Sequence, residues 1–165
     1  MKAQYIEAPN IEKPKYPSVF LAGGITNCPE WQDDLKELLS NEMITIFNPR
    51  RKKFPIHDPN AAKEQITWEF KALNGATIFS MWFCNTDSDQ PICLYELGRH
   101  LVLRKDCPET IVIGVEPGYR RAQDVYIQTG LVNPLISLKI SDNLNDHAFK
   151  IKKAIEIYID KGLWK

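Results

Sequence analysis

The sequence lacks most of the patterns that accompany metal, redox or membrane chemistry. Its four cysteines show no CxxC spacing, and its three histidines form no HExxH or HxH pattern, which disfavours a zinc site or a redox pair. No stretch approaches the roughly 18 apolar residues of a membrane span, and the first residues lack the apolar core of a signal peptide. We therefore expect reduced thiols, no metal, no cofactor, no membrane association and a cytoplasmic location.

An excess of charge of either sign is also absent. The 21 basic and 21 acidic residues cancel, so no overall field attracts nucleic acid, and a small molecule is the favoured partner. A chain of 165 residues has the size of one ordinary domain.

The first 17 residues contain three prolines, at positions 9, 14 and 17. Each proline lacks an amide donor and restricts the residue before it, which predicts an irregular lead-in over residues 1–17. The domain itself is then expected over residues 18–165.

Beyond the lead-in, short apolar runs alternate with amphipathic segments. The runs predict strands over 18–24, 43–49, 76–83, 110–115 and 134–140. Helices are predicted near 28–41, 63–73, 122–129 and 144–161, with one more beginning at Gln90-Pro91; in the second, Ile66, Phe70 and Leu73 share one face. This alternation predicts an α/β fold: a doubly wound, mostly parallel five-stranded sheet with helices on both faces, similar to flavodoxin or Rossmann folds.

In such a sheet, ligands bind beyond the carboxyl ends of the strands. Gly23 and Gly24 follow the first strand, where they form either a plain turn or a backbone that a ligand approaches closely. After the second strand, Asn48, Arg50 and Arg51 lie in "NPRRKKF", which is either a solvated loop or a phosphate-binding segment.

Acidic residues follow the third strand and lie on the helices around it. Asp87 and Asp89 are most simply loop or helix-cap residues. Glu69 lies between core-facing positions of its helix, where it is either an exposed acid or a site residue. Glu96 lies at the margin of an apolar stripe near a helix start, and periodicity leaves open whether it is an exposed acid or a buried nucleophile. Gly98, two residues later, is unfavourable in a helix and calls for a packing or access reason.

Three large aromatic residues have two interpretations each. Trp31, Trp82 and Phe83 either stack on a base or belong to the core.

Several of these segments together resemble the nucleoside 2-deoxyribosyltransferase family, in particular its second branch. The matching elements are "VFLAGG", "NPRR", "QITWEFKALNGATIFSMWF" and "CLYELGRH", in the expected order over residues 18–100, with a weaker match through "VIGVEP". The family fold is the doubly wound sheet already predicted.

The resemblance implies double displacement at the anomeric carbon of a nucleoside. The glutamate of the "ELG" motif, Glu96, corresponds to the nucleophile, and Glu69 corresponds to the acid that binds the nucleobase and moves its proton. A loop acid, Asp87 or Asp89, is expected to hold the sugar hydroxyls. Gly98 would keep the helix open beside the sugar. The partners implied are a nucleoside or nucleotide, a free nucleobase and further copies of the chain in a homo-oligomer.

One position departs from the family pattern. The better-known branch has a tyrosine that orients the nucleophile where this sequence has Phe20; Tyr95 and Tyr119 are candidate substitutes. In this family, residues of one subunit complete the active site of a neighbouring subunit. In this sequence such residues are expected in "YRRAQDVYIQTGLVNP".

Three activities agree with this pattern. They are sugar transfer between nucleobases, hydrolysis of a nucleoside 5′-monophosphate with Arg50 or Arg51 on the phosphate, and non-catalytic nucleotide sensing.

Overall fold

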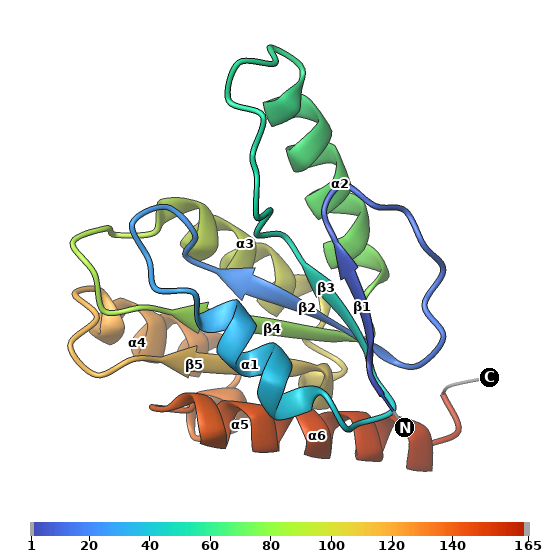
Figure 1. Ribbon diagram of the computed structural model, residues 1–165. Helices are drawn as coiled ribbons and strands as arrows, with labels where there is room; N and C mark the ends of the chain where they lie inside the picture. The colour runs from blue at the N-terminus through green and yellow to red at the C-terminus, as the bar shows by residue number, and fades with distance from the viewer. Residues whose placement is uncertain (1, 164–165) are drawn as a thin grey trace.

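The computed structural model describes residues 2–163, which form a parallel β-sheet between two layers of helices (Figure 1). The five strands lie in the order β1-β3-β2-β4-β5, and all neighbouring pairs are parallel. Their bounds are β1 Gln4–Glu7, β2 Ser18–Gly23, β3 Thr45–Asn48, β4 Ile78–Phe83 and β5 Ile111–Val115. The predicted α/β fold class is confirmed.

Helices cover both faces of the sheet (Figure 1). Their bounds are α1 Trp31–Leu39, α2 Ala61–Gly75, α3 Pro91–Leu103, α4 Ala122–Val132, α5 Pro134–Ser137 and α6 Leu144–Asp160, with a short 3-10 turn at Pro108–Thr110. Helices α1 and α6 pack on one face, and α2 to α5 pack on the other. The four longer helices expected from the sequence are confirmed, as is the one that begins at Pro91.

Alternation along the central strands divides the core into two layers, because successive side chains of a strand point to opposite faces. In β2, Val19 and Leu21 face α1 and α6, whereas Phe20 and Ala22 face α2 and α3. Nearly every residue of β2 to β5 is buried, since helices cover both sides, whereas the edge strand β1 is mostly half-buried. The continuous apolar runs in the sequence therefore have a direct structural cause.

The connections create a switch point at the carboxyl ends of the strands, where doubly wound sheets commonly bind ligands. From β2 the chain passes through α1 to β3 on one side, and from β3 it crosses back through α2 to β4 on the other. The loops after β2 and β4 therefore diverge at their carboxyl ends, which is the topological switch point of a doubly wound sheet.

Two predictions about the ends of the sheet are wrong. Residues 1–17 are not wholly irregular, since Gln4–Glu7 forms an edge strand whose Tyr5 pairs with Ile46 in the register of β3. Residues 134–140 do not form a strand but begin with the short helix α5, and a single bridge joins Ser141 to Gly114. Pro134 at the first helical position, after the Asn133 side chain that caps it, explains the helix.

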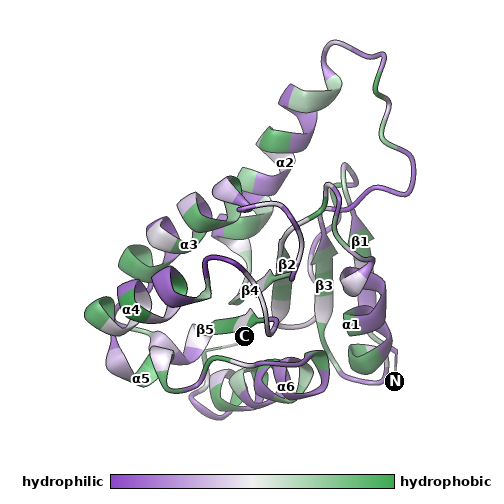
Figure 2. Ribbon diagram, turned by 90° about the vertical axis from the view of Figure 1, so that its left-hand side faces the viewer, coloured by the Kyte–Doolittle hydropathy of each residue, from purple (hydrophilic) through white to green (hydrophobic). Residues whose placement is uncertain are grey.

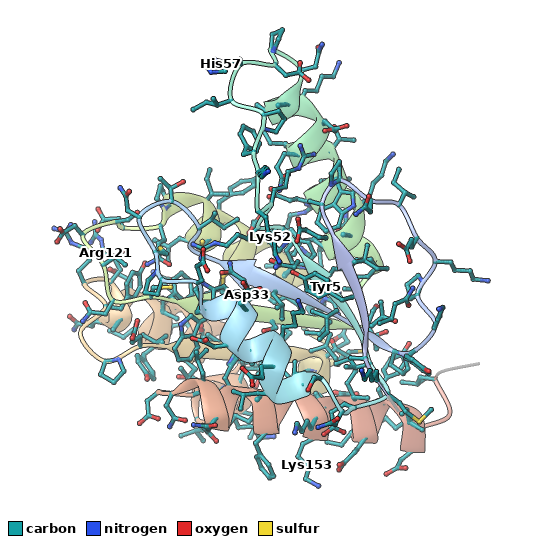
Figure 3. The ribbon with its side chains drawn as sticks, in the orientation of Figure 1. Tyr5, Asp33, Lys52, His57, Arg121 and Lys153 are labelled. Carbon is teal, nitrogen blue, oxygen red and sulfur yellow. The ribbon has the colours of Figure 1, made fainter. Side chains whose placement is uncertain are left out.

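The expected buried face of α2 is also wrong. Ile66 and Phe70 are 65% and 52% exposed, whereas Trp68, Ala72 and Leu73 are buried. The amino-terminal half of α2 and the loop before it extend beyond the sheet, and Figure 3 places His57 at the outer tip of that loop. Apolar residues lie on more than one side of α2, and the side that packs on the core is the one with Trp68, Ala72 and Leu73.

Within residues 2–163, no helix combines the length and apolar character needed to cross a membrane.

Candidate active site

A cavity of about 210 Å³ opens at the switch point, between the ends of β2 and β4. Gly23 and Gly24 line it from the loop after β2, Glu69 from α2, and Gln90 and Glu96 from the segment that forms α3. The other lining residues are Phe20, Ala22, Ile25, Thr26, Pro49, Ser88, Pro91, Ile92 and Cys93. The fold thus brings together four of the site residues predicted from the sequence, namely the two glycines and the two glutamates.

Glu69 and Glu96 face the same cavity from neighbouring helices, and both are half-buried. Loss of hydration raises the pKa of Glu69 above its ordinary value. The pKa of Glu96 is raised to about 7, mainly by loss of hydration and to a smaller extent by the nearby charge of Glu69. Because two carboxylates in one cavity repel each other, the pair retains a proton near neutral pH.

Glu69 is held by its own helix. The Gln65 side chain, one turn earlier, donates through Nε2 to Glu69 Oε1 at 2.7 Å and to the carbonyl of Pro49 at 2.7 Å. The charge of Arg51 opposes the rise in the pKa of Glu69. These contacts fix the orientation of the Glu69 carboxylate at the cavity wall.

The Glu96 carboxylate accepts no hydrogen bond from residues 2–163, and the positive charge that acts on it comes from Arg99. Arg99 lies one turn later on α3, where it donates to Asn74 Oδ1 at 3.1 Å and covers the ring of Phe70. Glu96 therefore enters the cavity with free acceptor sites.

Neither tyrosine considered as a substitute for the missing hydroxyl reaches Glu96. Tyr95 is 71% exposed, on another side of α3. Tyr119 donates its hydroxyl to the backbone carbonyl of Asp89 at 2.8 Å and stacks on Phe83. At the position of Phe20 the cavity wall is an aromatic ring that packs against Trp68.

The two glycines after β2 are required by close packing. A Cβ on Gly23, whose φ is 153°, would lie 2.3 Å from the carbonyl oxygen of Trp82, and one on Gly24 would lie 2.4 Å from Cys28 Sγ. Trp31 Nε1 donates to the carbonyl of Gly24 at 2.9 Å. The glycine loop is therefore a tightly packed wall of the cavity.

The polar candidates at the end of β3 and just after it, Asn48, Arg50 and Arg51, lie outside the cavity lining. The Arg50 guanidinium donates to the carbonyls of Ile25, Cys28 and Pro29 at 2.6 to 2.9 Å. Asn48 donates to the Tyr5 hydroxyl and accepts from the Arg50 amide.

Arg51 is engaged by a different partner. It pairs with Glu64 at 2.6 Å, with only 6% of its side chain exposed. Both arginines thus bind protein groups, and Arg50 holds the loop that borders the cavity.

Asp87 and Asp89 also lie away from the glutamates. Asp87 lines a neighbouring cleft with Asn85 and Arg120, and Ser88 lines both this cleft and the cavity. The carboxylate of Asp89 pairs with Arg120 at 3.3 Å and with Arg121 at 3.6 Å; Figure 3 labels Arg121 near the loops at the carboxyl ends of the strands. From this loop, the cavity receives Ser88 and Gln90 instead.

The remaining candidates are core or surface residues. Trp31, Trp82 and Phe83 are at most 3% exposed and do not line the cavity, so they belong to the core. Gly98 lies on the exposed side of α3, with nothing within 4 Å of an added Cβ, and it does not border the cavity. No cluster of three or more potential metal ligands occurs among the described residues.

Sequence reasoning missed Gln65, Arg99 and Gln90. Gln65 and Arg99 lie four and three residues from the two glutamates, a helical spacing that predicts contact. Gln90 gave no such signal, because its contacts with Cys84 and with the glycine loop join segments that only the structure brings together.

The chain is similar to a known protein family. A family model described as nucleoside 2-deoxyribosyltransferase-like matches residues 16–119, which include every residue that lines the cavity. No curated protein matches the chain. Since the match covers more than half of the 165 residues, the chain belongs to the nucleoside 2-deoxyribosyltransferase-like family.

Proposed function

We propose that this protein cleaves the N-glycosidic bond of a deoxynucleoside and transfers the sugar to another nucleobase, with Glu96 as the nucleophile. The observation that carries the proposal is the pair of half-buried carboxylates, Glu69 and Glu96, in one cavity at the switch point of the sheet. Family membership supports a nucleoside as substrate.

In the first step the ionised Glu96 carboxylate attacks the anomeric carbon and forms a glycosyl ester. The bond from that carbon to the base nitrogen breaks, and its electron pair leaves with the base. In the reactive form the proton that the pair retains lies on Glu69, which passes it to the departing base. The sugar passes through an oxocarbenium-like state, which the carboxylate below it stabilises.

In the second step a nitrogen of the incoming base attacks the same carbon and releases Glu96. The proton of that nitrogen passes to Glu69, so the site returns to its starting state. Two displacements at one carbon retain its configuration.

The contacts of the two arginines favour an unphosphorylated substrate. Arg50 is engaged by three backbone carbonyls and Arg51 by Glu64, and neither lines the cavity. Hydrolysis of a nucleoside 5′-monophosphate, which would use a cation at the sugar 5′ position, therefore has less support.

The size of the cavity supports an assembled site. Its 210 Å³ is below the roughly 300–1,000 Å³ of common ligand sites, so it fits the sugar better than the whole nucleoside. We propose that a second copy of the chain encloses the base, as the homo-oligomer expected for this family implies.

The test is incubation with a deoxynucleoside and a second free base, and separately with a deoxynucleoside 5′-monophosphate. Base exchange is expected with the first mixture, and Glu96→Gln should lower its rate about 10³-fold or more without unfolding the protein. Glu37→Gln, on the exposed side of α1, is the control. Cleavage of the monophosphate alone would favour the hydrolase, and no reaction with either substrate would refute both activities.

Mass spectrometry provides an independent test of the nucleophile. A slow 2-fluorinated deoxyribosyl substrate should leave a glycosyl adduct on the peptide that contains Glu96, and Glu96→Gln should show none. A variant that lacks turnover but retains a nucleotide-dependent response would indicate a sensor.

A further inference from the structure

Gln90 has an unusual backbone and a buried side chain. Its φ of 48° and ψ of 54° lie in the left-handed region, which residues other than glycine seldom adopt, and only 4% of the residue is exposed. Such a conformation persists only where the surroundings fix it, and it is found preferentially at functional sites.

The side-chain amide of Gln90 pairs with the backbone of Cys84, at the carboxyl end of β4. Its Oε1 accepts from the Cys84 amide at 3.3 Å, and its Nε2 donates to the Cys84 carbonyl at 2.7 Å. Both polar atoms of a buried side chain thus bind the backbone N–H and C=O of one residue, as a neighbouring strand would.

Gln90 is also the residue at which α3 begins. Its carbonyl accepts from the Leu94 amide at 3.2 Å, and Pro91 follows as the first helical residue. The same side chain lies against the glycine loop, where a Cβ added to Gly24 would lie 2.7 Å from Gln90 Oε1. One residue therefore contacts the end of β4, the start of α3 and the loop after β2.

We propose that Gln90 is a positioning residue, which fixes the start of α3, and with it Glu96, against the end of β4 and the glycine loop. Glu96 lies six residues later on the same helix, about 9 Å along its axis, so any shift of the start displaces the carboxylate. The proposal rests on the proposed function in that Glu96 is taken as the nucleophile. A misplacement of about 1 Å is enough to lower a rate about 10²-fold.

Gln90→Met and Gln90→Gly test the proposal together. The methionine keeps the length but makes no amide pair, and the glycine permits the backbone but removes the side chain. Both are expected to lower kcat about tenfold or more, with a smaller change in KM. Gln32→Met is the matched control: this glutamine is fully buried on α1, its amide has no partner, and it does not line the cavity.

A second measurement does not require turnover. Carbon-13 NMR titration of Glu96 should show a lower midpoint in Gln90→Met than in the wild type, because a loosened cavity admits water, and no change in Gln32→Met. If the wild type cleaves no nucleoside, a shifted midpoint would still support positioning while the proposed function fails. An unchanged midpoint, or a folded Gln90→Met protein with wild-type kcat, would overturn the proposal.

Discussion

Among single side chains, Glu96 shows the conflict between stability and activity most directly. Burial raises the pKa of Glu96 to about 7, so between pH 4.5 and 7 the folded protein holds a proton that the unfolded chain has lost. The free energy of unfolding should therefore fall as the pH rises through this window and then level off. A charged carboxylate in this place costs stability, as the proposed role of Glu96 as nucleophile would require.

Glu96→Gln should consequently stabilise the protein above pH 7 and change little at pH 4.5. We expect a gain on the order of 1 kcal/mol at pH 8, or about 2–4 °C in Tm for a protein of this size. Thermal unfolding at the two pH values measures it, with Glu37→Gln as the control. Equal changes in Tm at both pH values would contradict a raised pKa of Glu96.

Among the elements, the loop after β2 is held in place by a residue that follows the next strand, β3. Arg50 follows β3, and its guanidinium binds three carbonyls of residues 25–29, the segment that borders the cavity. Hydrogen bonds from a charged donor are stronger than neutral ones. Arg50 thus couples two carboxyl ends of the sheet.

Arg50→Met should release this loop. We expect a loss of about 1–3 kcal/mol in the free energy of unfolding. The fractional loss in kcat/KM should be the same for a deoxynucleoside and for any 5′-monophosphate that is accepted. Denaturant unfolding and steady-state kinetics measure these effects, with the exposed Lys53→Met as the control. A loss confined to the monophosphate would mean that Arg50 binds phosphate.

In the molecule as a whole, one side carries large apolar side chains that nothing in the monomer covers. Helices α2, α3 and α4 cover the same face of the sheet, and Figure 2 shows hydrophobic segments on α3 and α4; the exposed apolar residues of these helices include Ile66, Phe70, Ile92, Tyr95, Tyr126 and Ile127. Exposed apolar patches of this kind mark interaction surfaces. This side adjoins the cavity, which Ile92 also lines.

We expect the protein to be a dimer or larger. Ile127→Asp should yield a folded monomer, because a buried unpaired charge disfavours association. The activity of this monomer should be at least about tenfold lower. Ile11→Asp, at an exposed position of the amino-terminal segment, should change neither property. Analytical ultracentrifugation and the base-exchange assay measure the two effects. A fully active wild-type monomer would contradict the assembled site.

Local patterns were sufficient for the fold class, whereas the choice of Glu69 and Glu96 came from the resemblance to family motifs. The strands β2, β4 and β5 are continuous apolar runs, because both faces of the sheet are covered, and such runs are visible without a structure. The family motifs contain both Glu69 and Glu96, and both residues line the one cavity. The spacing of hydrophobic residues and family motifs are local properties, so the sequence carries them.

The tertiary structure decided where the remaining polar groups point. Arg50 and Asp89 lie in the predicted loops, but both bind residues that are distant in the chain. Arg50 donates a hydrogen bond to the carbonyl of Ile25, and Asp89 forms an ion pair with Arg120. Gln90 acquires its contacts because β4, α3 and the glycine loop meet at one point. Side-chain direction depends on contacts between segments far apart in the sequence, and these contacts form only when the sheet has assembled.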